Sequence, residues 1–223
     1  MVPFSFAGEE MALAAGLALY WPRERALLVA DLHLEKASYF ARFGQMLPPY
    51  DSRETLARLA DAVRITGARR VFCLGDNFHD AEGADRLEPH AAGMLDALTR
   101  ITDWVWVSGN HDQGRVPSGT AVDEIEVSGI MLRHEAVPGD PRPELSGHFH
   151  PKLKVTARGR RVVRPCAVAS ERKLILPAFG ALTGGMDAAD PAIIAALQPA
   201  RAVDALLGVQ GRLVQYPLWR AAT

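Results

Sequence analysis

Six of the seven histidines in this chain lie in short polar segments, three of which also hold aspartate or asparagine. In chain order the segments are Asp31-Leu32-His33, Gly75-Asp76-Asn77-Phe78-His79, Gly109-Asn110-His111-Asp112, His134 alone, and Gly147-His148-Phe149-His150. Side chains two positions apart point the same way in an extended chain, so each Asp-x-His or His-x-His pair can bind one metal ion together. Mixed histidine, aspartate and asparagine ligands without thiolate suit Mn, Fe, Zn, Ni or Co rather than copper or an iron–sulfur cluster.

The positions of these segments are more informative than any single one. Alone, an Asp-x-His triplet is most often a surface turn, and a Gly-His-x-His pair is most often two exposed histidines. Three of the segments, however, follow short apolar runs that are typical of buried strands: Leu27–Ala30, Val71–Leu74 and Trp104–Val107. The carboxyl ends of neighbouring strands in an open α/β sheet converge on one crevice. That crevice would receive the side chains of Asp31, His33, Asp76, Asn110 and His111.

Helix-like segments separate these predicted strands. Asp51 and Glu54 have the spacing of a capping box, an amphipathic pattern follows them, and Gly67 ends the segment. A second amphipathic helix is predicted from Leu87 to Leu98.

The second half of the chain changes character and predicts short strands with Gly and Pro turns. Their ranges are Val122–Val127, Ile130–Arg133, Lys152–Thr156 and Arg161–Ala169. Asp190–Leu197 is predicted to be helical, and Arg201–Leu207 with Arg212–Tyr216 to form a closing hairpin. A βαβαβ half followed by a mostly antiparallel half indicates an α/β fold in which residues 1–223 form one domain with two sheets.

Composition excludes several classes of protein. Hydrophobic residues make up 48% and charged residues 23% of the 223 residues, which excludes disorder as the main state. The net charge of −1 gives no global positive field, so a nucleic-acid partner would need a local patch. Only two cysteines are present, which excludes a disulfide framework and fits a reducing cytoplasm. The longest charge-free stretches are shorter than the ~20 apolar residues that span a bilayer, so no membrane association is expected.

As a set, the five segments between residues 31 and 150 resemble the signature of the calcineurin-like metallophosphoesterases. The segments Ala30–Ala37, Phe43–Gln45 and Leu47–Asp51 are most similar to the bacterial ligase-associated DNA damage response endonucleases within that superfamily. The resemblance implies an α/β fold with two packed β-sheets flanked by helices, an αββα sandwich. It also implies a dinuclear-metal-dependent phosphodiesterase, a DNA endonuclease in a repair system that contains a DNA ligase and a helicase.

The same resemblance implies which residues bind two divalent ions, with Mn expected first. One ion would be held by Asp31, His33, Asp76 and His150. The other would be held by Asp76, Asn110, His134 and His148, so that Asp76 bridges the two. A hydroxide between the ions is the expected nucleophile, because metal coordination lowers the pKa of bound water toward ~7.

Three further residues are expected to act without binding metal. His111 resembles the family's catalytic histidine, which stabilises the transition state or protonates the leaving oxygen. Asp112 would orient His111. His79 would help to seat the phosphate, and the alternative is a hydrogen-bonded turn residue.

DNA would be bound through a local basic segment. Lys152 to Lys173 holds eight basic residues against one acid, Glu171, directly after the last histidine pair. A DNA backbone could run along such a patch, although a solvated hairpin has the same composition. No motif for reading a specific DNA sequence is present.

The sequence is compatible with two other classes of function. A small-molecule phosphoesterase acting on nucleotides or diphosphate-linked substrates could use the same dimetal centre, and the near-neutral net charge of −1 favours it slightly. A non-catalytic scaffold of the same fold would be expected to lack the catalytic histidine, whereas His111 and every ligand position are filled here.

Overall fold

The first sheet follows the order of the sequence, β1-β2-β3-β4-β5-β6-β7, in a computed structural model that describes residues 1–14, 17–112, 116–157 and 159–222. Its strands are β1 (Val2–Phe6), β2 (Glu9–Leu13), β3 (Leu19–Trp21), β4 (Ala26–Val29), β5 (Arg70–Leu74), β6 (Asp103–Val107) and β7 (Thr120–Val122). β1 to β4 pair antiparallel, and β4 to β7 pair parallel. Helices cross over between β4 and β5 and between β5 and β6, as parallel neighbours require. These helices are α1 (Lys36–Ala41), α2 (Asp51–Thr66), α3 (Gly83–Arg86) and α4 (Pro89–Ile101).

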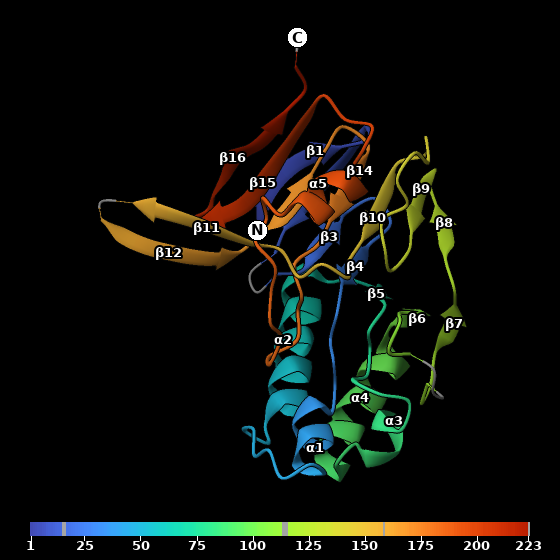
Figure 1. Ribbon diagram of the computed structural model, residues 1–223. Coiled ribbons are helices and arrows are strands. Elements are labelled where there is room, and N and C mark those ends of the chain that lie inside the picture. Colours follow the sequence, from blue (N-terminus) through green and yellow to red (C-terminus); the bar gives the residue numbers. More distant parts are fainter. Residues whose placement is uncertain (15–16, 113–115, 158, 223) are drawn as a thin grey trace.

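The second sheet has the order β16-β15-β13-β14-β10-β9-β8. Its strands are β8 (Ile125–Val127), β9 (Ile130–Leu132), β10 (Glu144–Ser146), β13 (Ala167–Ala169), β14 (Lys173–Ile175), β15 (Ala202–Val209) and β16 (Arg212–Arg220). β9, β10 and β14 are parallel neighbours, and the other pairs are antiparallel. A separate hairpin, β11 (Lys152–Ala157) with β12 (Arg160–Pro165), projects from the body of the molecule (Figure 1).

Side chains alternate between two apolar layers along the central strands. In β5 and β6, Phe72, Leu74, Val105 and Val107 join the core that lies between the two sheets. The intervening residues, such as Cys73 and Trp106, pack with residues of α2 and α4 on the outer face of the first sheet. A third cluster packs α5 (Pro191–Ala196) on the outer face of the second sheet. The order of layers is helix, sheet, sheet, helix, which confirms the predicted α/β sandwich (Figure 1).

The strands that carry the polar segments lie where the sequence predicts them. The apolar runs ending at residues 30, 74 and 107 form β4, β5 and β6. The range Val122–Val127 is wrong as one strand, because the chain leaves the first sheet after Val122 and enters the second at Ile125. The range Arg161–Ala169 is also wrong as one strand: it is divided between the β11–β12 hairpin and the second sheet at Pro165, whose nitrogen carries no hydrogen to continue a ladder.

The predicted helix from Asp51 is confirmed, but its predicted capping box is wrong. Tyr50 is the N-cap residue and no side chain caps the helix. The carboxylate of Asp51 instead accepts a hydrogen bond of 3.0 Å from the backbone N–H of Ala37, in the first turn of α1. Asp51 therefore fixes α1, the helix that follows the first polar segment, against α2. Gly67 ends α2, as predicted, and it adopts the left-handed conformation.

The basic segment does not form one continuous surface. Lys173, on β14, is buried, and its Nζ lies 3.1 Å from Glu144 Oε1 on the neighbouring strand β10. Arg158 lies outside the described residues. Lys152, Lys154, Arg160, Arg161 and Arg164 all lie on the projecting hairpin. In the part of the chain that the structure describes, no helix is long and apolar enough to cross a membrane.

Candidate metal centre

The polar segments meet at the carboxyl ends of parallel strands from both sheets. Asp31 and His33 follow β4, Asp76 follows β5, and Asn110 follows β6 in the first sheet. In the second sheet, His134 follows β9, and the pair of His148 and His150 follows β10. Because the two sheets pack face to face, the ends of these five strands face one another.

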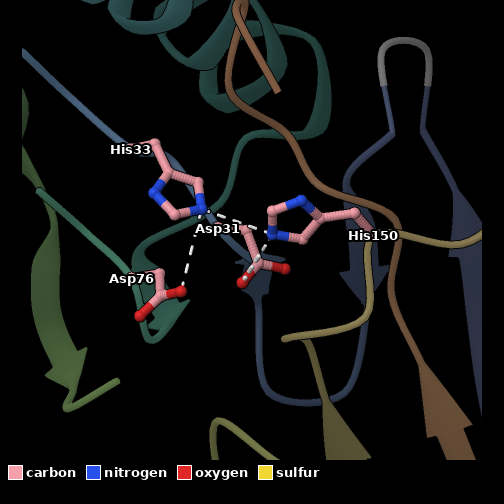
Figure 2. Close-up of side chains that lie close together, drawn as sticks. All are labelled: Asp31, His33, Asp76 and His150. Carbon is pink, nitrogen blue, oxygen red and sulfur yellow. Dashed lines mark hydrogen bonds and ion pairs between the residues drawn. The ribbon is translucent and has the colours of Figure 1, made fainter. Parts of the chain in front are cut away.

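Four side chains form the first group of metal-binding atoms. One atom from each of Asp31, His33, Asp76 and His150 lies within 4.8 Å of the others (Figure 2). His33 Nε2 lies 3.3 Å from His150 Nε2 and 3.7 Å from Asp76 Oδ2, and His150 Nε2 lies 3.4 Å from Asp31 Oδ1. Donors bound to one cation at ~2.1 Å lie roughly 3.0–3.4 Å apart, so the first and last of these spacings match a shared ion and the 3.7 Å spacing to Asp76 is slightly longer.

The second group shares Asp76 with the first. It consists of Asp76, His134 and His148. His134 Nε2 lies 3.5 Å from Asp76 Oδ1 and 3.1 Å from His148 Nδ1. The side-chain amide of Asn110 lies 3.4 Å from the same nitrogen of His148. The seven residues expected to bind metal are thus brought together as two groups around one carboxylate.

Hydrogen bonds to the protein fix how the histidines present their nitrogens. His134 Nδ1 lies 3.0 Å from the carbonyl oxygen of Leu74, which only a protonated Nδ1 can approach as a donor. This bond leaves the lone pair of Nε2 directed to Asp76 and His148, the arrangement that a metal-binding histidine requires. Glu135 Oε1 lies 3.8 Å from His148 Nε2, the nitrogen on the far side from this group. Glu135 adjoins His134 in the chain but belongs to no motif that would mark it as part of the site.

The metal-binding groups sit on strained backbone. Five of the expected ligands have positive φ, a region that non-glycine residues rarely adopt: Asp31 (53°), His33 (44°), Asp76 (49°), His148 (73°) and His150 (49°). Such strain costs on the order of 1–3 kcal/mol per residue and is characteristic of functional sites. Backbone hydrogen bonds from Asp31 to Gly75 and from His33 to Asp76 hold the first two segments together.

Glycines next to the ligands allow the segments to approach one another. A Cβ on Gly75, where φ is +79°, would lie 2.3 Å from His134 Nδ1, and one on Gly109 would lie 2.2 Å from the backbone nitrogen of Asp76. A Cβ on Gly147 would lie 2.7 Å from Asp31 Oδ2. These contacts explain why glycine precedes three of the polar segments.

Replacing Gly75 by alanine is expected to displace His134 and weaken the second group. We expect Gly75→Ala to lower the free energy of unfolding by about 2 kcal/mol or more and to lower the bound metal per chain. Gly93→Ala is the matched control, because this glycine lies on α4 with no atom within 4 Å of the added methyl group. The control should be neutral or stabilising by about 0.5–1 kcal/mol. Wild-type metal content in Gly75→Ala would contradict the expected displacement.

The protonation state of His33 suits metal binding. Burial, with the nearby His150 and Lys36 in addition, lowers the pKa of His33 to about 2. The imidazole is therefore neutral at neutral pH and offers a lone pair without first losing a proton. Burial, then Lys36 and His111, lowers the pKa of His79 to about 4.

His111 lies at the open side of the centre. Its ring is half-exposed, Nε2 lies 3.9 Å from Asp76 Oδ2, and its backbone N–H donates to Asp76 Oδ1 at 3.0 Å. Nδ1 donates to the carbonyl oxygen of His79 at 2.9 Å, which directs Nε2 toward the centre. The rings of His79 and His111 stack at 5.4 Å, and His79 Nδ1 lies 3.5 Å from His33 Nδ1. His79 thus contacts both a ligand and His111.

Asp112, expected to orient His111, directs its carboxylate to main-chain groups, while the ring of His111 bonds to the carbonyl oxygen of His79. Its carboxylate accepts hydrogen bonds from the backbone N–H groups of Asn77, Phe78 and Gly109 and from the side-chain amide of Asn77. The pKa of this carboxyl is raised above its usual value, because the effect of burial exceeds the lowering by these backbone hydrogen bonds. Asp112 therefore holds the segment after β5 against the segment after β6, because the main-chain donors of both turns converge on it.

A helix-covered pair of sheets with histidine, aspartate and asparagine gathered at the strand ends defines a metal-dependent hydrolase. Comparison with known proteins agrees: the family model of the calcineurin-like phosphoesterases matches residues 24–205. The chain therefore belongs to the calcineurin-like phosphoesterase family. It is a metal-dependent phosphoesterase, with the candidate ligands for divalent metal described above.

Solved structures provide a second comparison. The chain is similar to the Pseudomonas putida nuclease MPE, with 32% identity and a TM-score of 0.71, over 97% of this chain and 98% of that chain. This full-length similarity is consistent with the resemblance to the ligase-associated endonucleases. The chain is also similar to Yfce, a phosphoesterase from E. coli, with 13% identity and a TM-score of 0.39, over 82% of this chain and 87% of that chain. A search of curated protein sequences found no match.

Proposed function

We propose that this protein is a dinuclear metal-dependent phosphodiesterase that cleaves DNA endonucleolytically, within a repair system that includes a DNA ligase and a helicase. The observation that carries the chemistry is the position of Asp76, whose two oxygens face two separate groups of ligands. The similarity to a nuclease over nearly the whole of both chains supports a nucleic acid as the substrate.

Two divalent cations fit the donors of this centre. The first would be held by Asp31, His33, Asp76 and His150, and the second by Asp76, Asn110, His134 and His148. Manganese is our first choice, because nitrogen and oxygen donors without thiolate suit it. When bound, two such ions would supply a hydroxide nucleophile at neutral pH and would attract the negative phosphate.

The residues around the ligands divide the remaining work. His111 directs Nε2 into the centre from its half-exposed position, and with both ring nitrogens protonated it could donate a proton to the leaving oxygen or a hydrogen bond to the phosphate. His79 holds His111 through its backbone carbonyl and stacked ring. Asp112 keeps the two polar segments in register and so positions both Asp76 and His111.

DNA is proposed to reach the centre along the β11–β12 hairpin. β11 begins two residues after His150, so Lys152 at its start lies close to the first group of ligands, and the hairpin leads away from there. The positively charged side chains of the hairpin are Lys152, Lys154, Arg160, Arg161 and Arg164. Such side chains bind the backbone without reading sequence. We place the enzyme in the cytoplasm, where its two buried, free cysteines would stay reduced.

Nicking of supercoiled plasmid tests the proposed function. Protein stripped of metal and reloaded with Mn²⁺ is expected to convert supercoiled plasmid to nicked circles, and EDTA is expected to stop the reaction. Bis(p-nitrophenyl) phosphate serves as a small diester in parallel. Hydrolysis of the small diester by protein that cuts neither plasmid nor single-stranded DNA would reject DNA as the substrate. That result would favour a small-molecule substrate.

A further inference from the structure

A pocket of about 170 Å³ lies beside the metal centre and is not used by the chemistry described above. It is lined by His150 together with Arg58 of α2, Lys152 of β11 and Thr183 in the segment after β14. His150 separates this pocket from the first group of ligands, because its Nε2 faces His33 and Asp31. An occupant of the pocket would therefore lie next to a substrate held at the metals.

The wall of the pocket is joined directly to two metal-binding residues. In the segment after β14, Gly180 donates a backbone hydrogen bond of 3.2 Å to the carbonyl of Asp31. Met186, at the other end of the same segment, donates one of 3.2 Å to the carbonyl of His150. A Cβ on Gly185 would lie 2.5 Å from the side chain of Lys152, so glycine is needed for the lysine to lie along this wall. The pocket and the metal centre are thus parts of one rigid arrangement.

The charge of the pocket is positive and incompletely neutralised. Arg58 and Lys152 are its charged lining residues, and no carboxylate lines it among the described residues. Nε and Nη2 of Arg58 have no hydrogen-bond partner in the described part of the chain. The nearest acid to Arg58, Glu54, lies 3.6 Å from Nη2, which is too long for a hydrogen bond. Lys152 Nζ donates to a neutral group, the carbonyl oxygen of Thr183, at 3.3 Å. An anion is the occupant whose charge would balance these two cations.

The row of cations continues from the pocket along one face of the hairpin. Lys152 and Lys154 are two positions apart on β11 and share that face. Thr156, the next residue on the same face, is paired with Arg161 of β12. Lys154 Nζ lies 3.8 Å from Asp187, so its charge is partly balanced. Because the hairpin projects from the body of the molecule (Figure 1), this row leads from Lys152 toward the end of the hairpin.

We propose that Arg58 and Lys152 bind a backbone phosphate of the nucleic acid that flanks the phosphate cleaved at the metals, as the first contact of the row along β11. This assignment rests on the proposed function. A polymer with a phosphate on every nucleotide can occupy the pocket and the metal centre at once, whereas a small diester has no second phosphate to place there. The pocket thereby favours cleavage within a strand over hydrolysis of small esters.

The test compares two substrates in the Mn²⁺-loaded protein. We expect Arg58→Gln and Lys152→Gln each to lower kcat/KM for a single-stranded oligonucleotide about tenfold or more, the effect of losing a charge-assisted hydrogen bond. Hydrolysis of bis(p-nitrophenyl) phosphate should stay within about twofold of wild type, which also reports an intact fold. Arg64→Gln is the matched control, an exposed arginine of α2 that pairs with Asp61 and does not line the pocket.

Binding provides a second readout that does not depend on turnover. Metal-free protein is titrated against a fluorescein-labelled oligonucleotide at several salt concentrations. Each variant should show a salt dependence of log Kd that is shallower by about 0.7, the value for one phosphate contact on a single strand. The phosphate site alone would be overturned if the two variants lost equal activity on both substrates. It would also be overturned if they lost no activity on DNA that the wild type cleaves. Wild-type protein that hydrolyses the small diester but neither binds nor cleaves DNA would overturn the proposed substrate and the flanking-phosphate assignment with it.

Discussion

Asp76→Asn is expected to abolish phosphodiester hydrolysis while leaving the protein folded. One oxygen of this carboxylate faces His33 and the other faces His134, so its charge serves both groups of ligands. Removing a single preorganised group that stabilises charge in a transition state commonly costs 100- to 1000-fold in rate. Loss of the residue shared by both groups of candidate ligands should cost at least about 1000-fold in kcat on both DNA and bis(p-nitrophenyl) phosphate.

Measurements of stability and metal content distinguish loss of metal from unfolding as the cause of the lost activity. Asp76 is buried with Asp31 in the same centre, so neutralising it removes a buried negative charge from the metal-free protein. We therefore expect the metal-free variant to melt at or above the Tm of the metal-free wild type, and mass spectrometry to find less than one metal per chain. Asp61→Asn, an exposed carboxylate on α2, is the matched control. An Asp76→Asn protein that retains two metals and substantial activity would show that Asp76 does not bridge.

His111→Ala is expected to lower kcat for DNA by about 100- to 10,000-fold without loss of metal, the range for a positioned general acid or base. The expectation follows from how the ring is held: Nδ1 donates to the carbonyl oxygen of His79, and Nε2 faces the centre, 3.9 Å from Asp76 Oδ2, without belonging to either group of ligands. Metal content should match the wild type. His134→Ala, in contrast, should lose metal, because His134 belongs to the second group.

The leaving group decides which role His111 has. p-Nitrophenolate leaves readily without a proton, so a general acid should matter much less for bis(p-nitrophenyl) phosphate than for DNA. Equal losses on both substrates would indicate that His111 stabilises the phosphate instead. His90→Ala is the control, since His90 is an exposed residue of α4. A metal-depleted His111→Ala protein would contradict the assignment, because it would make His111 a ligand.

The sequence determined most of the site's composition, because each polar segment is local. Asp31-x-His33 and the segment that starts at Gly75 follow apolar runs that are short enough to be read as strands, and these runs form β4 and β5. The glycines that precede three segments were also visible, although the reason for them was not. The contact of Gly75 with the ring of His134 depends on a residue from the other sheet.

The sequence was less reliable wherever one pattern has two structural solutions. Asp51 and Glu54 have capping-box spacing, yet the Asp51 carboxylate bonds to Ala37 of another helix. Lys173 has the composition of a basic surface, yet it is buried against Glu144 between neighbouring strands. In both cases the side chain bonds to a partner from another element of the fold instead of adopting the local or solvated arrangement.

The sequence by itself thus determined the types of ligand, the strand ends that carry them and the class of chemistry. Only the tertiary structure decided that Asp112 bonds to the main chain of two turns, that Gly75 lies against the ring of His134, and that Arg58 and Lys152 line one pocket. The physical reason is separation along the chain. His33 and His150 are 117 positions apart, and His134 and Leu74 are 60 apart. Such contacts arise from the packing of one sheet on the other, which no local pattern encodes.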